Sequence, residues 1–555
     1  MNLLGKMQDK EFWAYVRDAE CYKPLVEKLK NEYTKNMEKG DLKCLKYSEF
    51  KLYWTTGERY KYEGSLNHIG GRMMASAILS LIYPEEQEYL DTLMDSLFAI
   101  CDEYSWCLPA HHGALSKPDS ARVDLNAATT AASLAEVYTL LGDRLEPLIK
   151  NRIVAELDRR VINTFYPATN YWWELRSYNW TAVCTGGVAR AIMLVRPELM
   201  TEEFIQRTVT SMECYLKGFD SMGICYEGNG YWSYGFGYFV LYADMIRRFT
   251  EGRVDFFKRE KVKKIACYYQ KMFLSGDKGV SFADSQAELR YPIHLMHFLK
   301  NEYPDDVLVY DFKYSTWPAC NIRSFGWFDE NIMKNPANDE VSFEMYSPEA
   351  QWLVKRTSSY GFAAKGGDNE EFHNHNDVGS FIFAKDGEHV FTDPGAALYV
   401  KGYFVNSERY KFLESSSRSH SVPIINGVLQ SFGKEFKAKG ARYENGTFSL
   451  DIAGAYECEG LNSIIREFVL KESEVIVTDT FDYSGEGKIV DRIVTRFEPK
   501  ALSEGELEVG KGSISFDPSL CELAVSSVQD SKNKTVWFID FTLKQGVNKI
   551  TYLMK

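Results

Sequence analysis

The hydrophobic pattern of this 555-residue chain changes its period near Pro318. Before that point, apolar residues recur at helical spacing. Residues 124–141, for example, place one apolar stripe on a helix, made of Ala128, Ala131, Leu134, Val137 and Leu141. Similar segments joined by short turns lie near 68–82, 87–101, 181–195, 202–217, 235–250 and 261–273. Because helices joined in this way pack as antiparallel hairpins, the sequence predicts an all-helical domain over residues 1–318.

After Pro318 the apolar period is two, as in strands. The clearest predicted strands are residues 352–356, 380–384, 464–470, 474–481 and 535–543, separated by turn clusters such as KDGE and SGEG. This pattern is typical of an antiparallel β-sandwich, which we expect over residues 319–555; a small β subdomain from about residue 490 is an open alternative. The sequence therefore predicts a multi-domain α+β protein with its active site in a cleft between the domains.

The net charge and the apolar content of the chain exclude some classes of binding partner and of cellular location. A net charge of −13 argues against a nucleic-acid or anionic-membrane partner, so a polyanionic substrate would have to meet a local basic patch. No run of eighteen apolar residues predicts a membrane span, and the N-terminus lacks the pattern of a signal peptide. We therefore expect a cytoplasmic protein, with secretion by another route left open. The eleven cysteines form no CxxC pair and are expected to be free thiols, and the oligomeric state is open.

Two of the nine histidines, His373 and His375, alternate within three positions. In an extended segment, residues two apart point to the same side, so both imidazoles can reach one pocket. His375, Asp393 and His420 together make a candidate divalent-metal set, since zinc commonly takes three such protein ligands plus water or substrate. His373 is then left for chemistry. The alternative is that Asp393 only forms a turn in Asp-Pro-Gly and His420 only caps a strand.

Two glycine-rich motifs in the helical half are further candidates. In residues 176–187, Asn179 stands at the start of a helix, either as a functional amide or as an N-cap, and Gly186-Gly187 permits another backbone to approach closely. In residues 226–237, glycines interleave with aromatic residues that either face a cleft or form core. His112 lies in a loop after Pro109 and could line a cleft.

Together, the segments NWTAVCTGGV, EGNGYWSYG, HNHNDVGSFIF, TDPG and RSHSVPIING resemble the heparinase II/III-like polysaccharide lyases and their alginate-lyase relatives. The resemblance implies an N-terminal (α/α) toroid, a C-terminal antiparallel β-sandwich and β-elimination across uronic-acid linkages, which gives 4,5-unsaturated uronate products. It favours glycosaminoglycans such as heparan sulfate, hyaluronan or chondroitin over alginate as the anionic substrate. It also implies a Zn²⁺ ion that organises the structure or the site, and no organic cofactor.

The resemblance assigns roles to individual residues. Asn179 matches the residue that neutralises the uronate carboxylate, and His373 matches a second active-site histidine. The catalytic tyrosine falls in EGNGYWSYG, where the separation from Asn179 favours Tyr234 and leaves Tyr231 as the alternate. The family's zinc ligands correspond to His375, Asp393 and His420. A second tyrosine that acts as base in some relatives corresponds to Tyr410 or Tyr403.

Further residues near these motifs are expected to contact the substrate, namely Arg176, Trp180, Glu227, Trp232, His112 and Arg409. A free tyrosine has a pKa near 10, so a tyrosine base needs cationic neighbours, for which Arg176, Arg409 and Arg418 are candidates. A rival enzyme class is a glycoside hydrolase, which needs two carboxylates from among Asp124, Glu227 and Asp377. A non-enzymatic rival is a sugar-binding β domain with a purely structural metal.

Overall fold

The computed structural model describes residues 2–42, 44–116, 119–168, 171–310, 315–316, 318, 320–338 and 341–555. The chain divides into two compact units. Unit 1 comprises Met1–Gly218, Ser233–Lys263 and Tyr291–Pro336, and unit 2 comprises Phe219–Trp232, Lys264–Arg290 and Ala337–Lys555. Two segments from the helical half of the sequence, Phe219–Trp232 and Lys264–Arg290, therefore belong to the same unit as the β half. A single domain boundary at residue 318 does not describe this arrangement.

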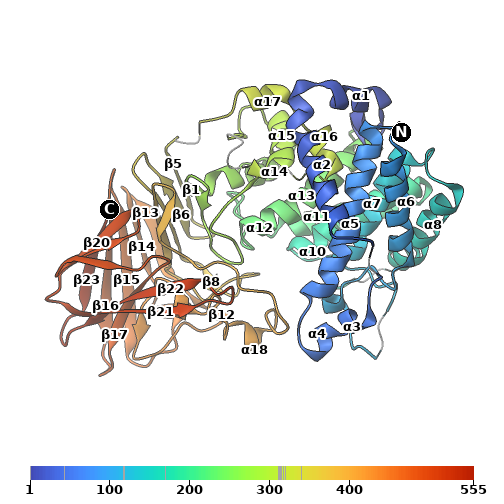
Figure 1. Ribbon diagram of the computed structural model, residues 1–555. Coiled ribbons are helices and arrows are strands. Elements are labelled where there is room, and N and C mark those ends of the chain that lie inside the picture. Colours follow the sequence, from blue (N-terminus) through green and yellow to red (C-terminus); the bar gives the residue numbers. More distant parts are fainter. Residues whose placement is uncertain are drawn as a thin grey trace. The chain divides into compact units, whose positions relative to one another are not determined.

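Unit 1 is built from helices (Figure 1). The longer ones are α1 (Lys10–Asp18), α2 (Lys23–Glu38), α5 (Tyr60–Ile82), α6 (Gln87–Asp102), α7 (Leu125–Leu141), α8 (Pro147–Leu157), α10 (Asn179–Val195), α11 (Glu202–Leu216), α13 (Gly237–Phe249) and α15 (Ile293–Glu302). The short ones are α3 (Tyr47–Phe50), α4 (Leu52–Thr55), α9 (Asn163–Phe165), α16 (Ile322–Gly326) and α17 (Glu330–Lys334). Helix α14 (Glu260–Ala266) crosses from unit 1 into unit 2, and β3 (Tyr291–Pro292) pairs in parallel with β4 (Ser315–Thr316).

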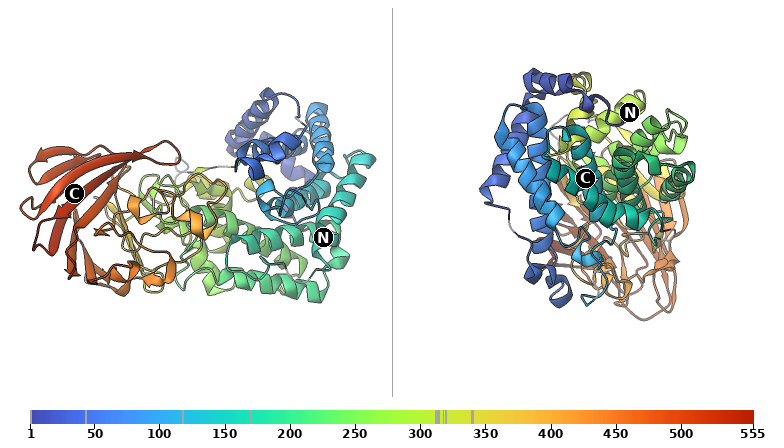
Figure 2. Two further views of the ribbon diagram at one scale, coloured as in Figure 1. Left: turned by 90° about the horizontal axis from the view of Figure 1, so that it is seen from below. Right: turned by 90° about the vertical axis from the view of Figure 1, so that its right-hand side faces the viewer.

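The first helices of unit 1 contact its last ones. The Trp13 ring of α1 lies 5.8 Å from the ring of Phe325 in α16, and the Tyr22 hydroxyl donates to the Phe325 carbonyl over 3.1 Å. Both Figure 1 and the right-hand view of Figure 2 show the dark-blue first helices beside the yellow-green helices that end the unit. These contacts close the helical hairpins into a ring, which the hydrophobic pattern alone could not establish.

Helices α7 and α10 pack closely against each other, which explains Gly187, the second of the paired glycines. A methyl group added to Gly187 of α10 would lie 2.6 Å from the Ala128 carbonyl oxygen of α7, so the two backbones approach as closely as glycine allows. The buried Glu136 of α7 accepts hydrogen bonds from Arg190 of α10 (2.6 Å) and Arg323 of α16 (2.9 Å). Glycine contact and buried charge thus join three helices of the ring.

Unit 2 is a β-sandwich whose described strand pairs are all antiparallel. A five-stranded sheet has the order β10-β9-β7-β6-β5, and an eight-stranded sheet has the order β13-β14-β15-β16-β23-β20-β19-β18. A four-stranded sheet has the order β11-β17-β22-β21, and the pairs β12-β8 and β1-β2 stand apart. The fold class predicted from the sequence, helices followed by an antiparallel sandwich, is confirmed.

The strand bounds agree closely with the predicted segments. Strands β6 (Trp352–Arg356) and β22 (Thr535–Leu543) have the expected bounds, and β9 (Phe381–Lys385), β15 (Leu461–Leu470) and β16 (Val475–Tyr483) overlap theirs. The other strands of unit 2 are β1 (Phe273–Ser275), β2 (Lys278–Gly279), β5 (Phe343–Ser347), β7 (Gly361–Lys365), β8 (Asp368–Asn369), β10 (Glu388–Phe391), β11 (Ile424–Ile425), β12 (Gly433–Lys437), β13 (Lys439–Glu444), β14 (Thr447–Asp451), β17 (Ile489–Thr495), β18 (Lys500–Ser503), β19 (Glu506–Val509), β20 (Gly512–Phe516), β21 (Cys521–Gln529) and β23 (Lys549–Met554). Unit 2 also holds the short helices α12 (Asn229–Tyr231) and α18 (Asn406–Arg409).

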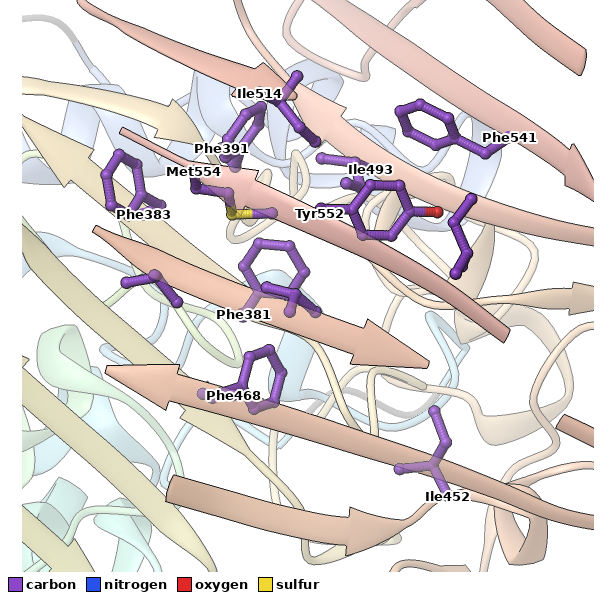
Figure 3. Close-up of a cluster of buried hydrophobic side chains, with 14 of the residues drawn as sticks. Phe381, Phe383, Phe391, Ile452, Phe468, Ile493, Ile514, Phe541, Tyr552 and Met554 are labelled. Carbon is purple, nitrogen blue, oxygen red and sulfur yellow. The ribbon is translucent and has the colours of Figure 1, made fainter. Parts of the chain in front are cut away.

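The core of unit 2 lies between its sheets and is rich in aromatic rings. Phe381 and Phe383 of β9, Phe468 of β15 and Tyr552 of β23 are buried there together (Figure 3). Strands β15 and β16 alternate buried and half-exposed residues, which is the period-two pattern that the sequence showed. Since β23 pairs with β16 and Met554 shares this core, the strands after residue 490 form no separate subdomain.

We predict that Gly187→Ala destabilises the protein by about 1–3 kcal/mol, because the added methyl group must push α7 and α10 apart. Gly70→Ala is the matched control: Gly70 also lies inside a helix, α5, but a methyl group there meets open space. The control should stabilise the protein by about 0.5–1 kcal/mol through helix propensity. Urea denaturation measures both values, and equal effects at the two positions would contradict the close contact.

Candidate active site and metal centre

Unit 2 brings the predicted metal ligands together at one buried point. Single ligand atoms of His375, Asp377, Asp393 and His420 all lie within 4.8 Å of one another, and the four residues are buried. His375, Asp393 and His420 are the set expected from the sequence. Asp377, which the sequence suggested only as a carboxylate for a rival hydrolase, joins them.

The hydrogen bonds around this cluster orient the two imidazoles. His420 Nε2 lies 2.9 Å from the Glu414 carbonyl oxygen, so that nitrogen must carry the proton and Nδ1 is a lone pair. His375 Nε2 lies 3.2 Å from Asp284 Oδ1, which fixes the same tautomer on that ring. Both Nδ1 atoms are therefore available as ligands, each held by a partner behind the ring, as is usual for metal-binding histidines.

The remaining polar atoms of the cluster test whether a cation fits. His375 Nδ1, His420 Nδ1, Asp377 Oδ2 and Asp393 Oδ2 are buried and make no hydrogen bond. Asp393 Oδ2 and His420 Nδ1 are only 2.9 Å apart, yet their geometry is not that of a hydrogen bond. Buried lone pairs without donors are costly, and two imidazoles with carboxylates are a donor set that zinc accepts. The residues therefore fit a divalent cation of this kind.

Turns and glycines set the backbone of this centre. Asp393 Oδ1 accepts from the Gly395 N–H over 2.8 Å, and Gly395 has a φ of +70° that favours glycine. A side chain at Gly395 would collide with the Ser285 carbonyl oxygen, so the Asp393 turn packs directly on the segment that carries Asp284. Asp377 Oδ1 accepts from the buried Lys365 ammonium over 2.6 Å, which leaves its other oxygen toward the cluster.

A second group surrounds His373. Its Nδ1 lies 2.8 Å from Asp284 Oδ2, and its Nε2 lies 3.5 Å from Glu227 Oε2. The Tyr231 ring stacks on the imidazole with centroids 4.0 Å apart, and the Tyr231 hydroxyl lies 3.1 Å from that of Tyr399. His373 also has a φ of +60°, which is strained for a residue with a side chain. Unit 2 thus brings together three of the predicted site residues, His373, Tyr231 and Glu227.

Asp284 is the residue of this region that sequence reasoning missed. It is fully buried and accepts from His373 and His375, from the Tyr403 hydroxyl and from Arg409 Nη2 (3.1 Å). Burial alone would raise its pKa, but the hydrogen bonds from both histidines and the charge of Arg409 hold that pKa well below its usual range. A lone aspartate in the sequence FADSQAE carries no spacing signal, so the sequence offered no way to find it.

The predicted second tyrosine and the predicted arginine lie beside this group. The Tyr410 hydroxyl donates to Asn374 Oδ1 over 2.7 Å, and Arg409 donates to the Asn374 carbonyl oxygen through Nε and Nη2. Arg409 is buried, which favours a role in holding the His373 segment over the substrate contact that we expected. Arg409 was also expected to lower tyrosine pKa values. Burial outweighs it, and the pKa of each of Tyr231, Tyr403 and Tyr410 is raised.

Unit 1 brings together the other pair of candidate catalytic residues. Asn179 is the first residue of α10 and is buried; the N-cap is Tyr178, so Asn179 is not the cap that the alternative interpretation supposed. A methyl group added to Gly235 would lie 3.1 Å from the Asn179 Cβ atom. The segment that carries Tyr234, the π-helical turn η6 (Trp232–Phe236), therefore packs on Asn179. The Tyr234 ring meets that of Tyr238 edge-on at 5.4 Å.

Aromatic rings continue from the Asn179 segment. The Trp180 ring lies 4.7 Å from that of His111 and 4.9 Å from that of Trp172, which is about half exposed. His111 Nδ1 lies 2.6 Å from Asp124 Oδ2. Arg176 is exposed and donates through Nε to the Trp172 carbonyl oxygen. Trp180 and Arg176 thus stay candidates for contact with substrate.

Two residues expected to contact the substrate, Trp232 and His112, are buried. Trp232 is completely buried, and its indole N–H donates to the Ile265 carbonyl oxygen over 2.8 Å, so it belongs to the core. His112 is buried against the rings of Phe50 and Trp54, and burial lowers its pKa. Its neighbour His111 is the histidine that lies beside Trp180. Aromatic and histidine side chains in glycine-containing loops occur both in cores and at binding surfaces. The sequence pattern does not distinguish a core position from a surface position.

No helix in the described part of the chain has both the length and the hydropathy needed to cross a membrane. Residues 349–536 match the family model described as heparinase II/III-like, C-terminal. The comparison with curated proteins finds no match.

Solved structures share the fold at low sequence identity. A mutant heparan sulfate lyase from Pedobacter heparinus is 12% identical with a TM-score of 0.61, over 93% of this chain and 78% of that one. A heparinase III structure is 14% identical with a TM-score of 0.59, over 87% of this chain and 75% of that one. Chondroitin AC lyase from Streptomyces coelicolor, in complex with chondroitin sulphate, is 9% identical with a TM-score of 0.58, over 98% of this chain and 82% of that one.

Residues 349–536 are therefore similar to the C-terminal domain of the heparinase II/III-like family, and the chain shares its fold with these solved lyase structures.

Proposed function

We propose that the protein cleaves uronic-acid-containing glycosaminoglycans by β-elimination and leaves a 4,5-unsaturated uronate on one product. The observation that carries this proposal is the group around His373, in which an imidazole from the heparinase-like segment meets a phenol and two carboxylates from other segments of unit 2. The solved structures of similar fold include enzymes named for heparan sulfate and for chondroitin, which supports this substrate class over alginate.

The reaction needs three tasks from this chain. Removal of the C5 proton places a second negative charge next to the uronate carboxylate, so that carboxylate must first receive hydrogen bonds, for which Asn179 is the proposed donor; His373 is the proposed second active-site residue. A base takes the C5 proton, and the electron pair of the C5–H bond forms the C4–C5 double bond as the C4–O4 bond breaks. The departing O4 keeps the electron pair of that bond and takes a proton from an acid. No water is consumed.

Tyr234 is the proposed proton carrier, and Tyr231 is the alternate. Burial raises the pKa of Tyr231, with the nearby Asp284 adding to the rise, so its phenol stays protonated at neutral pH. A protonated phenol stacked on His373 suits an acid or a hydrogen-bond donor better than a base. Tyr410, whose pKa burial raises and whose hydroxyl donates to Asn374, is placed to hold the His373 segment.

The metal centre is proposed to hold Zn²⁺ through His375, Asp393 and His420, with Asp377 as a fourth carboxylate. When bound, the ion supplies fixed positive charge that orients the loops around it. His375 also donates to Asp284, the acceptor of His373, so the ion would stabilise the segment that carries the catalytic histidine.

The hydrolase alternative loses two of its three carboxylates. Asp124 caps α7, where it accepts from the Ala127 N–H over 2.8 Å, and Asp377 belongs to the metal cluster. Only Glu227 remains near a candidate site, whereas glycoside hydrolysis needs a pair of carboxylates.

A panel of uronate polymers tests the function directly. We expect heparan sulfate, hyaluronan or chondroitin, and less so alginate, to give products that absorb ultraviolet light through the new C4–C5 double bond. New reducing ends without that absorbance would show hydrolysis and refute the proposal.

We predict that Tyr234→Phe lowers kcat by about 10²–10⁴-fold and leaves substrate binding largely intact, because the phenol acts on protons and not on affinity. Tyr360→Phe, which loses a buried hydroxyl that donates to the Lys471 carbonyl oxygen in the sandwich, is the control and should retain its turnover. Turnover kinetics and equilibrium binding measure the two effects. Unchanged turnover of Tyr234→Phe would move the role to Tyr231 or Tyr410.

We predict that the purified protein binds a divalent ion that a strong chelator removes. With Zn²⁺ at about 100 times its Kd, the free energy of unfolding should rise by about 2.7 kcal/mol over the chelated protein. His420→Ala should abolish this increment. His389→Ala, which removes a buried histidine outside the cluster, should keep it. Urea denaturation and elemental analysis are the measurements, and an increment that survives His420→Ala would contradict the assignment.

A further inference from the structure

We infer that Asp284 is a positioning residue that fixes the tautomer of His373 and couples this histidine to the metal ligand His375. The inference rests on the proposed lyase function for its kinetic consequence, but its structural content can be measured without any activity. Asp284 lies outside the matched family segment, residues 349–536.

The two oxygens of Asp284 serve different partners. Oδ2 lies 2.8 Å from His373 Nδ1. Oδ1 accepts from His375 Nε2, from the Tyr403 hydroxyl and from Arg409 Nη2. A carboxylate without a proton can only accept, so His373 must carry its proton on Nδ1. Its Nε2 atom is then the one that meets Glu227 and remains for chemistry.

The backbone gives Asp284 little freedom to move. Ala283, just before it, has a φ of +59°, a conformation that alanine rarely adopts. Ser285, just after it, accepts from the Asn229 N–H through Oγ (2.8 Å) and from the Ala396 N–H through its carbonyl oxygen (2.9 Å). Residues 283–285 are thus held between the turn that leads to Tyr231 and the turn that follows Asp393.

Glycines on both sides allow this close packing. A side chain at Gly228 would collide with Ser285 Oγ, and one at Gly395 would collide with the Ser285 carbonyl oxygen. Gly228 and Gly395 have φ values of +99° and +70°. The carboxylate is therefore fixed relative to both Tyr231 and the metal ligands, which is what a residue that orients an imidazole requires.

The substitution Asp284→Asn distinguishes a role in orienting His373 from a role in packing. It keeps the shape of the side chain, removes its negative charge and replaces one acceptor oxygen by an NH₂ donor. Arg409, the Tyr403 hydroxyl and His375 Nε2 all donate to Oδ1 of Asp284. In Asp284→Asn, the amide oxygen must therefore take the place of Oδ1, because the amide NH₂ cannot accept these hydrogen bonds. The amide NH₂ then faces His373 Nδ1, which must become an acceptor. The proton moves to Nε2, and the reactive lone pair is lost from the side that faces Glu227.

The spectroscopic test uses protein labelled with ¹⁵N at its nine histidines, with the His373 signals identified by their loss in His373→Gln. We expect a proton on Nδ1 of His373 in the wild type and on Nε2 in Asp284→Asn. A wild-type His373 with its proton only on Nε2 overturns the inference, and so does an unchanged tautomer in the variant. The wild-type spectrum alone decides the question if Asp284→Asn does not fold.

The kinetic test compares the same variant with Asp220→Asn, another buried aspartate of unit 2, whose partners are Ser347 and backbone N–H groups. Asp284→Asn should lower kcat by about 10²-fold with little change in KM, and Asp220→Asn should change neither. Wild-type kcat in a folded Asp284→Asn overturns the positioning role. A wild type without lyase activity on any polymer would instead refute the proposed function and leave the tautomer measurement to stand by itself.

Discussion

A single buried carboxylate organises the chemistry of unit 2. The Asp284 side chain has no contact with solvent and is surrounded by four donors from two other segments of the chain, residues 373–375 and residues 403–409. Removing one partner from such a buried charge typically costs about 3–5 kcal/mol, so these segments must order together. Asp284, the segment with His373 and His375, and the Tyr403–Arg409 loop therefore form one cooperative structure.

The sandwich core supports this structure from behind. The buried Arg466 of β15 holds Asp479 of β16 through both carboxylate oxygens. The same guanidinium donates to the carbonyl oxygens of Gly379 (2.9 Å) and Ser421 (2.6 Å). Gly379 follows Asp377 by two residues, and Ser421 follows His420 directly. The buried guanidinium of Arg466 thus fixes the backbone of both loops that carry metal ligands.

Some of this was visible in the sequence because its physical cause is local. The change in apolar period predicted helices and strands, and the scarcity of histidine together with the order His375, Asp393, His420 predicted the metal set. Other features depend on contacts between distant segments. Asp284 lies 89 residues before His373, with no spacing that points to it. Burial raises the pKa of Tyr231 and removes Trp232 and His112 from solvent. It depends on how distant segments pack, which no short motif in the sequence shows.

The proposed reaction breaks the glycosidic bond by elimination. Mass spectrometry of a defined uronate oligosaccharide digested in water enriched with heavy oxygen tests this most directly. Elimination predicts products whose masses sum to that of the substrate, with no heavy oxygen in either. Products whose masses sum to the substrate plus one water, with heavy oxygen at the new end, would contradict it.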